Sequence, residues 1–84
     1  MTYRVTVLPA AQRALRRVDR QHRQRVRGAI TLLALDPRPP ASRRLRGRPE
    51  FRVRVGDYRI LYTVHDDVLT VVVITLGHRR DVYD

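Results

Sequence analysis

The stretch that decides the fold is Glu50–Val64, EFRVRVGDYRILYTV. From Phe51 to Val55, apolar residues alternate with arginines, which is the period-two pattern of a half-buried β-strand. Gly56-Asp57 follows as a two-residue turn with glycine first, the order that a type II′ hairpin prefers. The alternation resumes from Tyr58 to Val64, with tyrosine and aliphatic side chains on one face. The stretch therefore predicts a β-hairpin with one face turned to the core.

The opposite face of this hairpin is basic. If both strands turn their apolar sides to one core, Arg52, Arg54 and Arg59 emerge together from the other side. These guanidinium groups repel one another and add nothing to a core, so we expect an anionic ligand on this face. The alternative is that Arg52 and Arg54 form only the solvated face of an edge strand.

The composition also indicates a polyanionic partner. The chain has 84 residues, enough for one small domain spanning residues 1–84, and a formal net charge of +10. Its 18 basic residues, all arginine, outnumber 8 acidic ones. A GC-rich genome would explain the missing lysine but not this excess. Because the arginine fork binds phosphate oxygens in pairs and keeps its charge, the excess favours nucleic acid, an acidic protein, or both.

Other classes of chemistry have little support in the sequence. There is no cysteine, and Ser42 has no histidine near it, so no nucleophilic triad is expected. His22, His65 and His78 lack the spacing of metal ligands, so we expect neither a metal nor another cofactor. No secretory signal is visible, and no apolar stretch is long enough to span a bilayer. The default expectation is a soluble cytoplasmic protein without a membrane partner.

The N-terminal half predicts a strand followed by two helices. Tyr3–Leu8 alternates and contains β-branched residues, which indicates a first strand. Pro9 is well placed at the first position of a helix that continues to about Val18. A second helix is predicted from about Arg20 to Leu35, and Asp36-Pro37 ends it because proline disfavours helical geometry in the residue before it.

The predicted fold is an α+β layer pair. Residues 38–49 form a connector rich in proline and arginine that Leu45 pins to the core, and Val68–Leu76, apolar on both faces, predicts the most covered strand. The order β-α-α-β-β-β predicts an antiparallel sheet of about four strands with the N-terminal helical hairpin packed on one face. Following the chain direction, we expect the first strand to run antiparallel to whichever strand it pairs with.

Two segments resemble a known family. LRGRPEFRVRVGDYRILYTV at 45–64 and ITLGHRRDVY at 74–83 are similar to the RelE/ParE superfamily of bacterial toxins. The common features are Leu-Arg-Gly, an alternating basic strand, Gly-Asp-Tyr-Arg followed by two hydrophobic residues and Tyr, and Gly-His-Arg followed by a tyrosine. RelE-like members are metal-independent endoribonucleases that cut mRNA at the ribosome, whereas ParE-like members poison DNA gyrase. The resemblance also implies a cognate acidic or amphipathic antitoxin, with operator DNA bound only through the antitoxin complex.

The resemblance assigns a site. The two strand lysines of RelE-like toxins fall on Arg52 and Arg54, the hairpin arginine on Arg59, the tail arginine on Arg79 and the tyrosine on Tyr83. All five positions are basic or tyrosine, as the ribonuclease pattern requires, so we expect a ribonuclease rather than a gyrase inhibitor. A module that binds antitoxin but has lost activity is the third hypothesis.

The expected chemistry suggests a role for each group. Attack of an RNA 2′-OH on the adjacent phosphate builds negative charge that fixed guanidinium groups can stabilise. Arginine with its high pKa cannot serve as the base; His78, whose ordinary pKa is about 6.5, and Tyr83 are the candidates. We therefore expect a catalytic set of Arg54, Arg59, His78, Arg79 and Tyr83, and an RNA-binding set of Arg52, Arg54 and Arg80.

Overall fold

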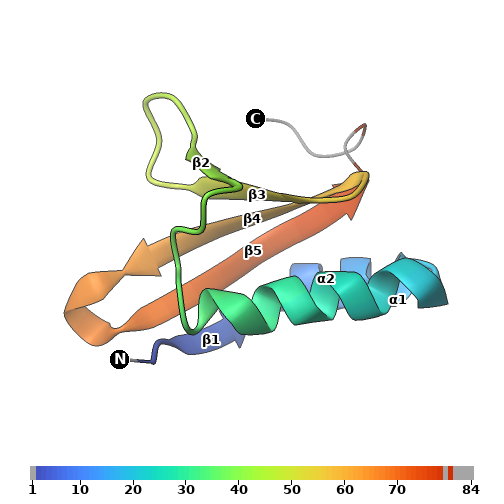
Figure 1. Cartoon of the computed structure of the whole chain (residues 1–84), viewed down its shortest axis with the longest axis horizontal. Helices are drawn as coiled ribbons and strands as arrows, with labels where there is room; N and C mark the ends of the chain where they lie inside the picture. The colour runs from blue at the N-terminus through green and yellow to red at the C-terminus, as the bar shows by residue number, and fades with distance from the viewer. Residues whose placement is uncertain (1, 79, 81–84) are drawn as a thin grey trace.

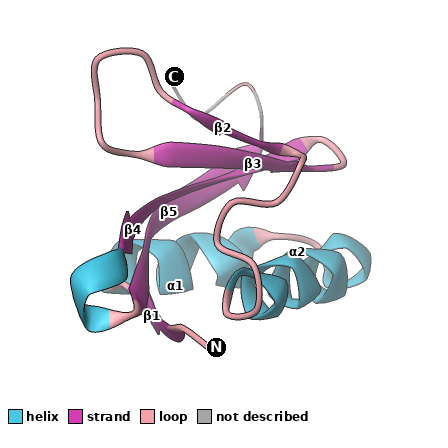
Figure 2. Ribbon diagram, turned by 60° about the vertical axis from the view of Figure 1, so that its left-hand side comes forward, coloured by secondary structure: helices cyan, strands magenta, loops and turns pink. Residues whose placement is uncertain are grey.

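A computed structural model describes residues 2–78 and 80 and shows a five-stranded sheet with two helices on one face (Figures 1 and 2). The elements in chain order are β1 (Arg4–Val7), α1 (Pro9–Arg17), α2 (Arg20–Leu33), β2 (Ser42–Arg44), β3 (Phe51–Val55), β4 (Tyr58–His65), the 3₁₀ turn η1 (Asp66–Val68) and β5 (Thr70–His78). The predicted α+β class, with the helical hairpin packed on one face, is confirmed. No helix in the described residues is long and apolar enough to cross a membrane.

The direction predicted for the first strand is wrong. The sheet order is β1-β5-β4-β3-β2, and β1 runs parallel to β5 while every other pair is antiparallel. The cause is β2, which lies within residues 38–49, where an irregular connector was predicted. This additional strand reverses the chain once more, so that β3, β4 and β5 each run opposite to the expected direction.

The helices begin and end for identifiable reasons. Pro9 occupies the first turn of α1, where a missing N–H leaves no hydrogen bond unmade. The Asp19 side chain caps α2 by accepting a hydrogen bond from the backbone N–H of His22 at 3.0 Å. α2 ends at Leu33, two residues before the predicted end, where the N–H of Ala34 and that of Leu35 turn to carbonyls three residues back.

The core lies between the helices and one face of the sheet. Its buried members are Ala11, Val18, Val26, Ile30, Leu33, Val53, Ile60, Tyr62, Val71, Val73 and Leu76. Tyr62 is fully buried, and its hydroxyl donates a hydrogen bond to the carbonyl of Pro37 at 2.7 Å. Leu45 is buried as predicted, but it lies outside this main cluster.

A polar cluster fixes the connector at the far end of the sheet. Asp66 accepts hydrogen bonds from both terminal nitrogens of Arg38, at 3.3 and 2.7 Å, and from the Tyr3 hydroxyl at 2.5 Å. The bond from Arg38 is the main reason that the pKa of Asp66 lies below its ordinary value. The Arg38 guanidinium also lies over the Phe51 ring, 5.5 Å from its centroid. The connector is thereby attached to β3 and to the β4–β5 turn.

The β3–β4 hairpin has the predicted turn and faces. Gly56 has a φ of +60°, and Leu69 is the only non-glycine with positive φ in the described part of the chain, so Asp57 has negative φ as a type II′ turn requires. Phe51, Val53 and Val55 face the helices together with their cross-strand partners on β4. The arginines between them therefore project from the opposite, open face.

A β-bulge divides β5 into two segments that face differently. Leu61 pairs with Thr75 and Tyr62 pairs with Val73, so Ile74 has no partner on β4. An extra residue of this kind reverses the alternation of side chains beyond it. As a result, Leu76 and His78 lie on the helix face of the sheet.

We predict that Tyr62→Phe lowers the free energy of unfolding by about 1–3 kcal/mol, because the buried Pro37 carbonyl loses its donor. Urea denaturation measures the change. Tyr3→Phe, which removes an exposed hydroxyl donor, is the matched control and should cost less. Equal urea midpoints for Tyr62→Phe and the wild type would contradict the prediction.

Candidate functional site

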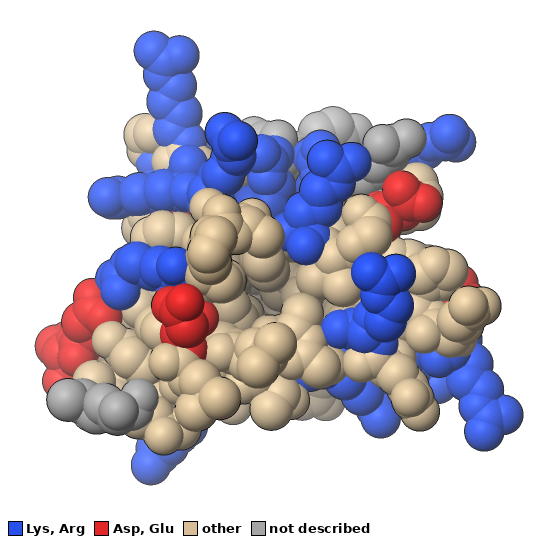
Figure 3. Space-filling model, in the orientation of Figure 1, with Lys and Arg blue, Asp and Glu red and all other residues tan. Residues whose placement is uncertain are grey.

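Two pairs of arginines face each other directly across neighbouring strands of the open face. Arg43 of β2 is the cross-strand partner of Arg52, and Arg54 of β3 is the partner of Arg59. Like charges at directly opposite positions destabilise a sheet. Figure 3 shows arginine side chains gathered along the upper side of the view, over the region of β2 and β3 in Figure 1. An anionic ligand at this part of the sheet would reduce the repulsion between these arginines.

These side chains enclose a cavity of about 290 Å³, which we call the arginine cavity. It is lined by Pro40, Ala41, Arg43, Arg52, Arg54 and Arg59. The connector closes one side, and β2, β3 and β4 supply the guanidinium groups. Several fork-shaped donors around one hollow can bind the oxygens of a phosphate and its neighbours along a strand.

The charges in the arginine cavity act on one another. The pKa of the Arg52 guanidinium is lowered, first by burial and then by the positive charges of Arg59, Arg43 and Arg54. Arg54 itself is exposed. A bound anion would act on the Arg52 pKa in the opposite direction, because a nearby negative charge favours the protonated guanidinium.

The structure brings together part of the predicted site and adds one residue to it. Arg52, Arg54 and Arg59 all line the arginine cavity. Arg43 lines it as well and was missed, because β2 has three residues, of which two are arginine, and shows no apolar alternation. Its only sequence signal is the charge itself.

The tail residues of the predicted site are placed only in part. Arg79 and Tyr83 lie outside the described residues, so their predicted roles stay predictions. Arg80 is exposed, and its backbone N–H donates a hydrogen bond to His78 Nδ1 at 3.3 Å.

His78 lies on the opposite side of the sheet from the arginine cavity. It is the cross-strand partner of Tyr58, and the two rings meet edge to face with centroids 5.8 Å apart. The bulge at Ile74 is the reason, because it turns the end of β5 over relative to its beginning. The structure therefore does not bring the predicted histidine to the arginines.

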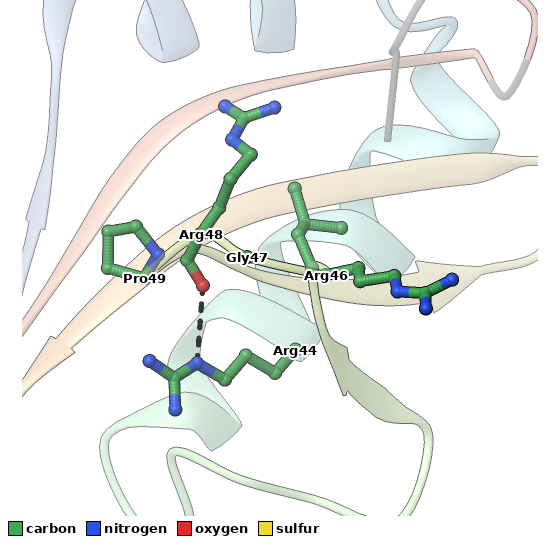
Figure 4. A pocket seen from close by; sticks show the side chains of 6 residues that line it. Arg44, Arg46, Gly47, Arg48 and Pro49 are labelled. Carbon is green, nitrogen blue, oxygen red and sulfur yellow. Dashed lines mark hydrogen bonds between the residues drawn. The ribbon is translucent and has the colours of Figure 1, made fainter.

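A larger hollow lies at the β2–β3 loop, but its charges do not converge. It has a volume of about 550 Å³ and is lined by Arg44, Leu45, Arg46, Gly47, Arg48 and Pro49. Figure 4 shows the three arginine side chains pointing away from one another, with Arg44 Nε donating to the Arg48 carbonyl at 3.2 Å. Arg48 is also paired with Glu50 at 3.1 Å. The arginine cavity is the better candidate, since its guanidinium groups surround one space.

Comparisons with known proteins agree on one family. Residues 5–83 match the family model described as the ParE toxin of the type II toxin–antitoxin system parDE. Toxin RelG of Mycobacterium tuberculosis is 43% identical over 44 residues, which are 52% of this chain and 48% of that toxin. The alignment thus spans about half the length of this curated relative.

Solved structures extend the similarity to nearly the whole chain. The toxin–antitoxin complex RelBE2 of Mycobacterium tuberculosis contains a chain with 29% identity and a TM-score of 0.83, covering 94% of this chain and 100% of that one. The RelE–RelB complex of Pyrococcus horikoshii contains one with 27% identity and a TM-score of 0.84, covering 98% and 100%. The RelBE complex of E. coli gives 26% identity and a TM-score of 0.74, covering 90% and 95%.

We predict that inorganic triphosphate raises the melting temperature of the protein, and that Arg54→Gln reduces this gain because it removes one donor from the arginine cavity. Arg13→Gln, which removes an exposed arginine of α1 outside this cavity, is the matched control and should keep the full gain. Differential scanning fluorimetry at constant ionic strength measures the shifts. Equal gains in the two variants would show that triphosphate acts through net charge alone.

Proposed function

The chain belongs to the ParE toxin family of type II toxin–antitoxin systems, and we propose that it is a ribosome-dependent, metal-independent endoribonuclease that cleaves mRNA. In the proposed reaction, the 2′-OH of a nucleotide attacks the adjacent 3′ phosphate, which forms a cyclic phosphate and releases the 5′ oxygen of the next nucleotide. The observation that carries the proposal is the arginine cavity, where two cross-strand like-charge pairs surround a space that fits a phosphate.

The arginines would act on the negative charge that the reaction builds. Attack of the 2′ oxygen gives a pentacoordinate phosphorane, and fixed guanidinium groups stabilise it without having to reorganise at that moment. We assign this role to Arg59, together with Arg79 as the family resemblance implies. Arg43, Arg52 and Arg54 would hold the flanking phosphates and so fix the scissile bond in position.

The proton of the 2′-OH needs a different group. Arginine is effectively always protonated in proteins and cannot accept this proton. His78 lies across the sheet from the arginine cavity, beside Tyr58, and this position argues against a role as the base. We assign this task to Tyr83, whose phenol would be acidified by nearby arginines. If Tyr83 only orients the phosphate, the proton leaves to solvent or to a ribosomal group.

The proposed partners follow from the family. The similar solved structures are toxin–antitoxin complexes, and we propose a cognate antitoxin whose acidic or amphipathic segment covers the arginine cavity. Complementary charge would make that association fast and sensitive to salt. Operator DNA would be bound only through this complex, and mRNA on the ribosome would be the substrate of the free toxin.

A second function has one specific observation in its favour. The family model that matches is described by its ParE members, so the alternative is a protein that inhibits DNA gyrase and hydrolyses nothing. The arginine cavity would then bind an acidic surface of a protein instead of RNA.

We expect Arg59→Gln to slow mRNA cleavage by about 10²–10³-fold, the usual cost of removing one donor to a developing oxyanion. Arg79→Ala should have a similar effect. The measurement is primer extension on a message translated in a purified system, with Arg13→Gln as a control that keeps wild-type cleavage. A wild-type protein that leaves the message intact but blocks supercoiling by gyrase would establish the alternative.

The pH dependence tests the base. With Tyr83 as acceptor, the single-turnover rate should rise with pH and level off below the ordinary tyrosine pKa of about 10, because nearby arginines favour the phenolate that accepts the proton. Tyr83→Phe should flatten the profile. A rate increase near neutral pH that disappears in His78→Gln would instead identify His78 as the base.

A further inference from the structure

A second cavity lies on the helix face of the sheet, and the proposed cleavage reaction does not use it. It has a volume of about 330 Å³ and is lined by Ala14, Arg17, Val18, Tyr58, Leu76, Gly77 and His78. We call it the aromatic cavity. Its volume is at the lower end of the range of about 300–1,000 Å³ that is usual for small-molecule sites. Figure 1 shows that the β3–β4 turn and the end of β5 lie above the α1–α2 turn, where this cavity is formed.

Two aromatic rings and an apolar floor define the cavity. The rings of Tyr58 and His78 meet at 75° and offer their faces and edges to the same space. Val18 and Leu76, both buried, form the floor. A flat, partly apolar group fits such walls, because its faces can stack on a ring and its edge can approach the perpendicular ring.

Polar contacts hold the rings in place. His22 packs on Tyr58 with a centroid distance of 5.5 Å, and its Nδ1 lies 2.8 Å from a carboxylate oxygen of Asp19. His78 Nδ1 accepts the hydrogen bond from the Arg80 backbone N–H, so the proton of the neutral ring is on Nε2. This nitrogen can donate to a polar edge of a ligand. Both rings are therefore oriented before anything binds.

The charge at the cavity identifies the class of ligand. Arg17, an exposed residue in the last turn of α1, is the one arginine in the lining. Aromatic faces beside an arginine are the combination that proteins use for single-stranded nucleic acid, where bases stack and phosphates pair with the guanidinium group. An aromatic side chain from an acidic peptide shares part of this chemistry, but it does not account for the cavity's position.

The aromatic cavity and the arginine cavity lie on opposite faces of the sheet, and β4 contributes a residue to each of them. Gly77 lines the aromatic cavity and is the cross-strand partner of Arg59, which lines the arginine cavity on the other face. β1 pairs only with residues 70–73 of β5, so within the described residues no strand flanks the last part of β5 on that side. A single strand bound at both cavities would therefore cross the end of β5 beside Gly77, a residue without a side chain.

We propose that the aromatic cavity binds a nucleobase of the same single strand whose phosphates lie in the arginine cavity. The base stacks on Tyr58 and His78, and Arg17 pairs with the phosphate next to it. The inference rests on the proposed function in so far as the strand is RNA, but it concerns binding and not cleavage. The aromatic cavity would thus contact a nucleobase, whereas the arginine cavity would contact only phosphates.

The test uses a labelled single-stranded oligoribonucleotide with 2′-O-methyl groups, which cannot be cleaved, and a series in which one base at a time is removed. For the wild-type protein, loss of one particular base should weaken binding about tenfold or more, as the loss of one stacking contact does. His78→Ala should abolish this difference, so that intact and abasic strands bind alike. His78→Phe, which keeps a ring, should restore it.

Two controls separate the aromatic cavity from charge and folding. His65→Ala, which removes an exposed histidine at the other end of β4, should keep the penalty for the missing base. Arg54→Gln should weaken intact and abasic strands by the same factor. Fluorescence anisotropy at fixed salt gives each affinity, and thermal melts verify that each variant is folded.

The proposal is overturned if no missing base weakens wild-type binding, or if His78→Ala keeps the full penalty. It is also overturned if His78→Ala weakens binding of the antitoxin while the oligonucleotide series is unchanged, because the cavity then holds a peptide. A wild-type protein that shows the base penalty but never cleaves mRNA would contradict the proposed function and support this inference.

Discussion

The register between β3 and β4 is the constraint on which the other features depend. The two-residue turn at Gly56 fixes it, and it places Val53 opposite Ile60 on one face and Arg54 opposite Arg59 on the other. A slip of one residue would bring arginines into the core and expose the apolar set. Burial of the apolar side chains of β3 and β4 against the helices therefore also keeps Arg54 and Arg59 side by side. The repulsion in the site is sustained by the core on the reverse of the same strands.

The connector depends on contacts made away from the site. Its beginning is held by the hydrogen bond from Tyr62 to the Pro37 carbonyl and by the pairing of Arg38 with Asp66. With these contacts made, the chain reaches Pro40 and Ala41 at the wall of the arginine cavity and then pairs as β2. Contacts between residues that do not line the arginine cavity thus determine the position of Arg43.

An element could be predicted from the sequence where its apolar residues recur at the spacing of a strand or a helix. The faces of the hairpin were predicted from the alternation of apolar residues between Phe51 and Val64. The helices were predicted from the helical spacing of their apolar residues and from the positions of Pro9 and Pro37. β2 carries two arginines in three residues and shows no period, so it was missed, and the direction of β1 was inferred wrongly with it. The bulge at Ile74 lies in a run that is apolar on both faces, where an extra residue breaks no pattern. The face on which His78 lies was consequently hidden.

The parallel pairing of β1 with β5 also determines when the fold can be completed. Arg4 pairs with Thr70, so the sheet joins segments from opposite ends of the described chain, and contacts of such long sequence separation form slowly. Among the described strands β1 pairs only with β5, so this edge of the sheet cannot form until β5 has been synthesised. The core that holds the arginines in register is therefore among the last parts to form. The hairpin that carries Arg52, Arg54 and Arg59 is thus fixed against a complete core only once β5 has paired with both of its neighbours.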